Sequence, residues 1–473
     1  MDILPDELRQ DIFTHLVGFF QCFDLVSPSL LAFNEALRTP RWRALLLNSP
    51  ELWAFAHARD DCPTDNALLR LCIERSGQHP LDVWIHSDLE FWNDSPGNSE
   101  HGEDDESNRP ITFFEWLDLL QRNMHRWRRV RIDFPRPTPI DRFAMFTRPM
   151  PLLEQLVLST PSTEFGENMV NTEWESDANS RHLYFQECPN LRSLTSHATV
   201  MTPAITLFKL EYLNLSIRGI EDDQPLWDAL AMTPTLRELT IYYERFFEYS
   251  SEFKLPQSPR HMPTLRRLDL LGYSQYDQDL SKFLSAPNLE TLTVSVDSCN
   301  QLGLTYASIG QTVCNVVMAA EEEHGMFMRS DALALDALQN VESLELRGIP
   351  PGSALGKIED FFASLAGIGK WSHDPMPKWG RTLRKIVLRG CTIELEDCTS
   401  LAALVGVRMT EARDNADDAF ELQSINTKLM KRMDYEIPES MAAVMHLLQP
   451  SIVEVKPEVS QLGAIGRHTR RRD

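Results

Sequence analysis

Pro234-Thr235-Leu236-Arg237-Glu238-Leu239-Thr240-Ile241 is the stretch that decides the fold. The same frame returns at Pro263-Thr264-Leu265-Arg266-Arg267-Leu268-Asp269-Leu270. Each copy has leucine-type residues at positions 1, 4 and 6, counted from the first leucine. Positions 4 and 6 share one side of a strand of period two, so the intervening residues face the other side. One such strand cannot cover its own apolar side, whereas stacked copies bury a continuous core. The frame therefore predicts a sheet built from repeats.

Further copies of the frame run along the chain from about residue 127. Complete copies begin at Leu153, Leu210, Leu236, Leu265, Leu289, Val341 and Leu383. Trp127-Val130-Ile132 fits as an opening copy and Leu191-Leu194 as a degraded one. The intervals between first positions are 26, 38, 19, 26, 29, 24, 52 and 42 residues. Four of the eight fall in the window of roughly 20–29 residues typical of leucine-rich repeats.

Proline precedes position 1 by two residues in several copies, where it stops any preceding helix from running into the strand. These prolines are Pro151, Pro189, Pro234, Pro263 and Pro287. The pattern resembles the leucine-rich repeats that follow the F-box in many substrate receptors. The Asn or Cys expected three residues after position 6 is found only as Cys391, so we expect an irregular outer side. Chance spacing, or amphipathic helices with i, i+3 contacts, are the alternative interpretations.

The longer intervals are interpreted as insertions. Polar composition predicts a loop over 160–180 and disorder over the acidic segment 94–109. The spacing over 306–325 favours a helix, although Val313, Val316 and Met318 also fit another strand. Leu355, Ile358, Phe361, Phe362 and Leu365 lie at helical spacing in 354–365. Residues 396–450 are expected to be mainly helices that cap the stack.

A different pattern occupies the first forty-odd residues. Leu8, Ile12, Phe13 and Leu16 recur on one face of a helix that begins after Pro5. A segment shorter than about 40 residues rarely buries enough area to be stable alone. It therefore needs the rest of the chain or a partner to cover its apolar face.

This N-terminal segment resembles the F-box, the adaptor-docking motif of cullin–RING ubiquitin ligases. The similarity rests on Leu4-Pro5, Glu7-Leu8, Ile12-Phe13, Asp24-Leu25 and Trp42-Arg43. Ser49-Pro50-Glu51-Leu52-Trp53, Glu74-Arg75-Ser76-Gly77 and Pro80-Leu81-Asp82 match blocks of a large group of fungal F-box proteins. Residues 27–40 lack the usual core before the final Trp-Arg, which leaves the third helix of the motif open. The resemblance implies docking of the ligase adaptor through Leu4, Pro5, Leu8, Ile12, Phe13, Leu16 and Trp42.

Composition excludes several classes of function. The 46 basic and 69 acidic residues give a net charge of −23, an unfavourable balance for binding nucleic acid. No secretory signal and no long apolar run occurs, so we expect no membrane span and a cytoplasmic or nuclear protein. The eight cysteines are scattered, which is typical of reduced, mostly buried thiols.

The sequence contains no motif of a known active site. Residues 352–357 imitate a phosphate-binding loop but are one residue short, and a helix start is the simpler interpretation. The thirteen histidines are isolated and no Cys-x-x-Cys occurs. We therefore expect no enzyme, no cofactor and no metal site.

Together these features predict an α/β protein in which a small N-terminal helical module precedes an irregular leucine-rich-repeat solenoid. The expected parts are 1–55 (adaptor-docking helices), 56–125 (a connector of helix and strand with the disordered acidic loop 94–109), 126–395 (repeats), 396–455 (helical cap) and 456–473 (disordered basic tail). The resemblance implies a substrate-recognition subunit of a cullin–RING ligase; the alternative is a repeat-built scaffold unrelated to ubiquitination. An unknown target protein would bind outward strand residues. The candidates are Glu238, Thr240, Arg267, Asp269, Thr291, Thr293, Ser343, Glu345 and Lys385.

Overall fold

The fold is described from a computed structural model. It describes residues 40–59, 63–86, 113–133, 148–159, 187–197, 207–217, 230–243, 260–272, 284–295, 312–320, 338, 340–348, 361–363, 365, 382–394, 398–414, 420–425, 428–432 and 451–455. The chain divides into two compact units, residues 1–265 and 266–473, and each is described by itself.

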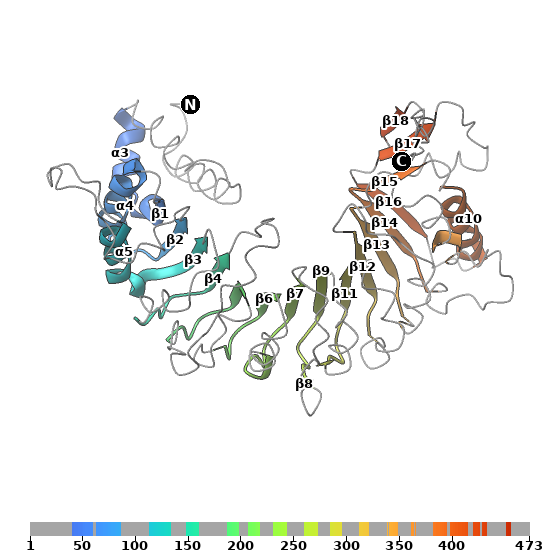
Figure 1. Ribbon diagram of the computed structural model, residues 1–473, viewed down its shortest axis with the longest axis horizontal. Coiled ribbons are helices and arrows are strands. Elements are labelled where there is room, and N and C mark those ends of the chain that lie inside the picture. Colours follow the sequence, from blue (N-terminus) through green and yellow to red (C-terminus); the bar gives the residue numbers. More distant parts are fainter. Residues whose placement is uncertain are drawn as a thin grey trace, which may run out of the picture. The chain divides into compact units, whose positions relative to one another are not determined.

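Short parallel strands dominate both units and belong to one 13-stranded sheet in which the strands follow their order in the chain (Figure 1). Unit 1 contributes β1 (Phe55–Arg59), β2 (Leu81–His86), β3 (Trp127–Asp133), β4 (Gln155–Ser159), β5 (Ser193–His197), β6 (Tyr212–Ile217) and β7 (Glu238–Tyr243). Unit 2 contributes β9 (Arg267–Gly272), β11 (Thr291–Ser295), β12 (Asn315–Ala319), β13 (Ser343–Arg347), β14 (Lys385–Arg389) and β16 (Glu421–Ile425). Parallel neighbours in chain order are the arrangement of a leucine-rich-repeat-like solenoid, which confirms the expected fold class.

The frame of positions 1, 4 and 6 is confirmed by burial. In the repeat that contains β7, the side chains of Leu236, Leu239 and Ile241 have no exposed surface. The same three positions are buried in every complete copy that the sequence identified, and the degraded copy forms β5 with Ser196 buried at position 6. The core is therefore a stack of these three rows of side chains.

Six of the described repeats enter their strands through the same turn. The amide of position 1 donates to the carbonyl oxygen three residues earlier, as from Leu236 to Thr233 (3.3 Å) and from Leu289 to Ala286 (3.2 Å). Each proline lies two residues before position 1 and is therefore the second residue of this turn. The fixed φ of proline suits that position of a β-turn. Proline thus shapes the entry turn as well as ending what precedes it.

In four repeats a threonine just before position 1 binds the previous repeat. Thr235 and Thr264 donate from their hydroxyls to the position-1 carbonyls of Leu210 (2.9 Å) and Leu236 (2.8 Å). In unit 2, Thr312 and Thr382 bind Leu289 and Val341 in the same way, at 2.9 and 2.7 Å. This threonine ladder was not predicted. It lies at the opposite end of the strand from Cys391, whose Sγ contacts the carbonyl of Leu346 (3.3 Å) as the sequence led us to expect of that position.

The helix favoured over 306–325 is wrong for the described residues 312–320. Asn315–Ala319 form β12, with Val313, Val316 and Met318 buried at positions 1, 4 and 6. The 52-residue interval therefore splits at Val313 into intervals of 24 and 28 residues. Pairing with β11 and β13 buries these three side chains in the core of the stack. This burial outweighed the helical spacing of the valines and the nearby alanines.

The sheet also begins earlier and ends later than residues 126–395. β1 and β2 lie in the segment assigned to a connector, and β16 lies in the segment expected to be a helical cap. The described residues of that C-terminal segment form helix α10 (Cys398–Asp414) and, besides β16, the strands β17 (Lys428–Arg432) and β18 (Ser451–Val455). β17 pairs in parallel with β18 and with β15 (Thr392–Glu394). Helix α10 buries Leu401, Leu404, Val405 and Arg408 along one face.

Helices cover the first strands of unit 1. α3 (Pro40–Asn48) and the 3-10 turn η1 (Pro50–Trp53) precede β1, α4 (Pro63–Arg75) links β1 to β2 and packs on β1, and α5 (Phe113–Arg122) with η4 (Met124–Arg126) links β2 to β3. In 354–365, the described residues 361–363 and 365 are helical, with Phe361, Phe362 and Leu365 buried. Two short strands, β8 (Arg260–His261) and β10 (Leu284–Ser285), complete the described elements. The segments 94–109, 160–180 and 456–473 lie outside the described residues.

Candidate protein-binding face

The outward side chains of the strands form continuous rows because neighbouring strands pair in register. In unit 2 the position-3 row contains Arg267, Thr291, Asn315, Ser343, Lys385 and Glu421. The position-5 row contains Asp269, Thr293, Val317, Glu345, Val387 and Gln423. We call these rows, with position 7 beyond them, the strand face. It is a regular surface on which side chains of neighbouring repeats lie side by side.

Seven of the nine candidate residues fall on the strand face of unit 2 and line up in its two rows. Asp269 and Thr293 are buried, while Arg267, Thr291, Ser343, Glu345 and Lys385 are half-buried. Glu238 and Thr240 lie on the strand face of unit 1, paired in register with Tyr212 and Asn214 of β6. Asn315 and Val317 belong to the rows as well, and were missed because their segment was interpreted as a helix.

Aromatic and charged side chains interlock across the first three strands of unit 1. The ring of His57 stacks on Trp84 with centroids 4.6 Å apart, and the Arg131 guanidinium lies 5.1 Å from the Trp84 ring. Asp133 accepts hydrogen bonds from Trp84 Nε1 (2.6 Å) and from Arg131 Nε (2.9 Å), and His86 Nδ1 lies 3.6 Å away. Burial alone would raise the pKa of Asp133, but these donors outweigh it and hold the pKa below its usual value. The carboxylate therefore stays charged and fixes the rings around it.

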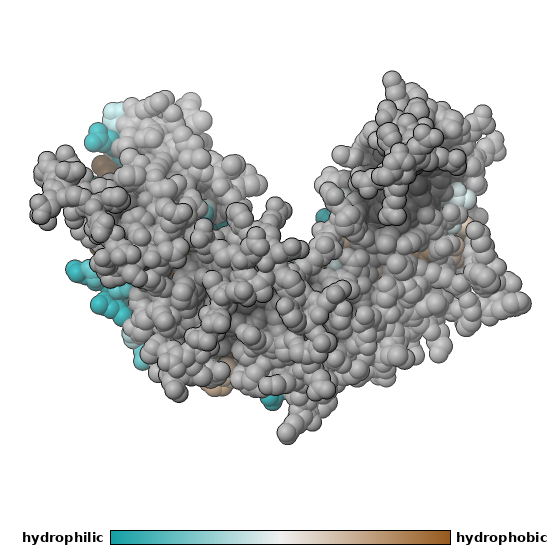
Figure 2. All heavy atoms as spheres, in the orientation of Figure 1, coloured by the Kyte–Doolittle hydropathy of each residue, from teal (hydrophilic) through white to brown (hydrophobic). Residues whose placement is uncertain are grey.

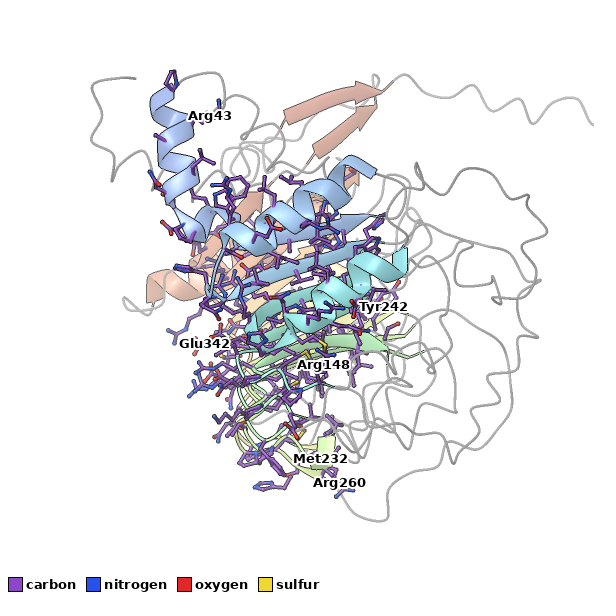
Figure 3. The ribbon with its side chains drawn as sticks, turned by 90° about the vertical axis from the view of Figure 1, so that its left-hand side faces the viewer. Arg43, Arg148, Met232, Tyr242, Arg260 and Glu342 are labelled. Carbon is purple, nitrogen blue, oxygen red and sulfur yellow. The ribbon has the colours of Figure 1, made fainter. Side chains whose placement is uncertain are left out.

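Two tyrosines stand out on the strand face of unit 1. Tyr212 begins β6 at position 3 and Tyr242 lies near the end of β7 (Figure 3); both are about two-fifths exposed, at 42% and 40%. Tyrosine supplies a large rigid contact area with one polar tip, which is why it is enriched at protein interfaces. In Figure 2 the coloured residues of this unit are mostly hydrophilic with small brown areas.

A further row, formed by the residues at position 2, lies at the edge of the sheet where the strands begin. In unit 1 it reads Arg128, Glu154, Arg192, Glu211 and Arg237, and each residue donates its amide to the carbonyl of the one before. Glu211 lies between two arginines, at 3.9 Å from Arg192 and 3.7 Å from Arg237. In unit 2 the row continues with Arg266, Glu290, Cys314, Glu342 and Arg384, and Figure 3 shows Glu342 at this edge. Opposite charges beside each other favour this register over a shifted one.

The sequence blocks 49–53, 74–77 and 80–82 pack together where α4 meets the sheet. Leu52 and Trp53 are buried, and the Arg75 guanidinium lies 5.6 Å from the Trp53 ring. Ser76 donates to the carbonyl of Ile73 (3.1 Å), and Gly77 ends the helix with φ +56°. The E-R-S-G block is thus the C-terminal end of α4, shaped to turn the chain into β2.

Two arginines from the next repeat hold these blocks in place. Arg126 is buried and donates to Ser76 Oγ (2.6 Å) and to the carbonyl of His79 (2.9 Å). Arg128 binds both carboxylate oxygens of Asp82 at 3.0 and 2.7 Å. The P-L-D block therefore supplies Leu81 to the core and Asp82 to an ion pair with β3. These residues are structural, and they join the segment before β1 firmly to the repeats.

Of the residues implied in adaptor docking, only Trp42 belongs to the part of the chain that the structure describes. Leu4, Pro5, Leu8, Ile12, Phe13 and Leu16 lie outside the described residues. Trp42 lies in helix α3, from which Arg43 projects (Figure 3). The segment before β1 thus has a helix over 40–48, whereas residues 27–39, on which the question of the third helix depends, lie outside the described residues.

The described residues offer no metal cluster and no membrane-spanning helix, and two of their buried thiols are unreactive. In the described parts of the chain, no group of three or more His, Cys, Asp or Glu side chains is arranged to hold a metal ion. No described helix is both long enough and apolar enough to cross a bilayer. Burial raises the pKa of the Cys72 and Cys188 thiols to about 12, so both are unreactive core groups at neutral pH.

Comparison with known proteins adds no assignment. No family model matches the chain, and no curated protein matches it. The structural finding is a repeat-like scaffold of parallel strands with a broad, regular face, an architecture suited to binding proteins.

Proposed function

We propose that this protein is the substrate-recognition subunit of a cullin–RING ubiquitin ligase. Its N-terminal segment would dock the ligase adaptor, and its strand face would hold the target protein. The ubiquitin transfer itself would be performed by other subunits, in the cytoplasm or nucleus. Holding a target lysine near the loaded enzyme makes the transfer effectively intramolecular, which is how a subunit without catalytic groups contributes to rate.

The observation that carries the proposal is the packing of residues 49–82. Blocks that resemble those of fungal F-box proteins are here consecutive parts of one packed unit, from Trp53 through Ser76 to Asp82. They connect helix α3 directly to the edge of the sheet. Helix α3 is thereby joined to the first repeats, which supports a receptor that holds its target at a set distance from its adaptor.

The strand face supports the second half of the proposal. It combines half-buried charged residues with exposed Tyr212 and Tyr242 and the Trp84–Arg131 stack. Tyrosine, tryptophan and arginine are the residues that most often dominate the binding energy of protein interfaces.

The proposal is tested by recovering the cullin adaptor with the full-length chain. Leu8→Asp should abolish recovery, because a charge would replace an apolar docking contact. Leu152→Asp is the matched control, since Leu152 is 40% exposed in the turn before β4 and far in sequence from the docking segment. Thermal unfolding of both variants should stay at the parental temperature. Unchanged adaptor recovery by Leu8→Asp would refute the ligase role.

The second candidate is a protein-binding scaffold without a ligase, favoured by the repeat-built sheet alone. In that case the N-terminal segment would only cap the first strand, β1. Leu8→Asp should then lower the melting temperature of the whole chain, because a charge would be buried in the cap. The same pair of variants therefore separates the two candidates.

A further inference from the structure

Two arginines lie side by side at position 7 of neighbouring repeats in unit 2. Arg347 ends β13 and Arg389 ends β14, and they are partners in the parallel register. Both follow a leucine of the core and precede a glycine, in Leu346-Arg347-Gly348 and Leu388-Arg389-Gly390. Like charges on adjacent strands repel each other, so this pairing needs an explanation.

Glu345 supplies part of that explanation. Its Oε1 accepts a hydrogen bond from Arg347 Nε (2.7 Å) and another from Arg389 Nε (2.6 Å). Burial would raise the pKa of Glu345, but the two guanidinium groups outweigh it and hold the pKa below its usual value. The carboxylate therefore stays ionised at neutral pH and keeps both side chains in place.

One carboxylate cannot neutralise two guanidinium groups. The cluster of Arg347, Arg389 and Glu345 keeps a formal charge of about +1. The other arginine–carboxylate pairs of the strand face are balanced one to one: Arg131 with Asp133, and Arg267 with Asp269. Within the described strand face, the excess positive charge of unit 2 therefore gathers at this cluster.

The hydrogen-bond donors that Arg347 and Arg389 do not use for Glu345 indicate which kind of ligand would bind. Each arginine uses Nε for Glu345, and no other hydrogen bond from either is found among the described residues, which leaves the Nη groups for a ligand. The two side chains are 39% and 47% exposed. Guanidinium Nη pairs match the oxygens of a carboxylate or phosphoryl group.

The surroundings fix this geometry. Val317 and Val387 are buried on either side of Glu345 in the position-5 row, so the cluster has apolar walls that strengthen its field. The amide of Gly348 donates to the carbonyl of Arg389 (3.0 Å). Gly348 also has φ +67°, and a Cβ there would lie 2.8 Å from the carbonyl oxygen of Ala320. The backbone after Arg347 is therefore held by a close contact that only glycine permits, and the Gly348 amide ties it to the carbonyl of Arg389.

We propose that Arg347, Arg389 and Glu345 form a binding site for one oxyanion, a carboxylate or phosphoryl group, carried by the protein that the strand face binds. The inference rests on the target-binding half of the proposed function and names the chemistry of one contact in it. The arginines bind the anion through their Nη groups, and Glu345 is a positioning residue that does not touch it.

The site is tested on the full-length chain with inorganic phosphate and with acetate, at constant ionic strength. Binding is followed by the 31P line width for phosphate and by saturation transfer to the methyl signal for acetate. We expect Arg347→Gln and Arg389→Gln each to weaken the apparent affinity about tenfold, the loss of one charge-assisted contact. Arg192→Gln is the control, because Arg192 is 65% exposed in the position-2 row of unit 1.

The outcomes divide clearly. A response to phosphate and acetate that both strand-face variants lose supports the site for either oxyanion, and a response to phosphate alone assigns it to phosphoryl groups. No response, or a response that both variants keep, overturns the proposal. Arg347→Lys with Arg389→Lys, which keeps the charge and loses the paired donors, guards against a folding defect: it should also bind weakly while melting at the parental temperature. Adaptor recovery is independent of these variants, so failure here leaves the ligase test standing.

Discussion

Replacing Arg126 by methionine should weaken the junction between α4 and β3 without changing its shape. Arg126 is only 3% exposed, and its guanidinium donates to Ser76 Oγ at 2.6 Å and twice to the carbonyl of His79 at 2.9 and 3.1 Å. A longer bond, 3.3 Å, reaches Asn123 Oδ1. Burial lowers the pKa of this guanidinium, yet no carboxylate contacts it among the described residues.

The magnitude follows from what methionine leaves behind. It has a similar length, so little cavity forms. The carbonyl of His79 and the oxygen of Ser76 lose a buried donor, and each unsatisfied group costs about 1–3 kcal/mol. Relief from burying the guanidinium offsets part of this cost, because a buried charge carries its own desolvation penalty. We expect a net loss of about 2–4 kcal/mol.

Amide hydrogen exchange read by mass spectrometry measures the effect where it arises. In a repeat protein each repeat contacts only its neighbours, so the loss should stay local. Peptides over residues 69–86 should exchange faster by about thirtyfold or more, the rate equivalent of 2 kcal/mol. Arg129→Met, at an exposed site of β3 three residues after Arg126, is the matched control and should leave exchange unchanged. Equal exchange in the two variants would refute the structural role given to Arg126.

Three further predictions concern the core, a turn and a charge. Leu268→Ala should cost about 2–5 kcal/mol in urea unfolding, because Leu268 is buried at position 4, whereas Thr291→Ala on the strand face should change stability by no more than about half a kcal/mol; similar losses would contradict the register. Gly348→Ala should lower the melting temperature, because the residue has φ +67° and its Cβ would meet the carbonyl oxygen of Ala320; an unchanged temperature would contradict that contact. Since the pKa of Asp133 is lowered on folding, its contribution is present above its ordinary value near 3.8 and is lost as the pH falls through the lower folded value. Asp133→Asn should therefore flatten the acid limb of stability below about pH 4, and a limb as steep as the parent's would contradict the bonds found for Asp133.

The repeats could be read from the sequence wherever their apolar residues are large. The frame of Leu236, Leu239 and Ile241 has no competing interpretation once it recurs with the same proline. The first strand escaped detection because Ala56 and Ala58 fill positions 4 and 6, and alanine carries little signal. The second escaped because its register with β3 shifts by one residue after Leu81, which breaks the spacing. Strands with small side chains or a bulge form because they pack against neighbouring strands. The sequence of one segment does not show that packing.

The candidate site was predictable in outline and not in its pairs. Alternation along a strand indicates which residues face outward, so Glu345 and Lys385 could be chosen one strand at a time. The partnership of Arg347 with Arg389 joins residues 42 apart, and it exists only because β13 and β14 pair in register. The threonine ladder was hidden for a similar reason: Thr235 and Thr264 were visible beside the prolines, but their acceptors belong to the previous repeat.

The alternating charges at position 2 make the pairing of neighbouring repeats in unit 1 depend on whether an odd or an even number of repeats is removed. Arg128, Glu154, Arg192, Glu211 and Arg237 change sign at every step, so removing the repeat of Arg192 would bring Glu154 beside Glu211. Removing two consecutive repeats, those of Arg192 and Glu211, would instead bring Arg237 beside Glu154 and keep opposite signs adjacent. Each such contact is worth only about 0.2–1 kcal/mol, so the preference is a bias and not a prohibition. Shortened or lengthened forms of this unit are thus expected to differ from it by an even number of repeats.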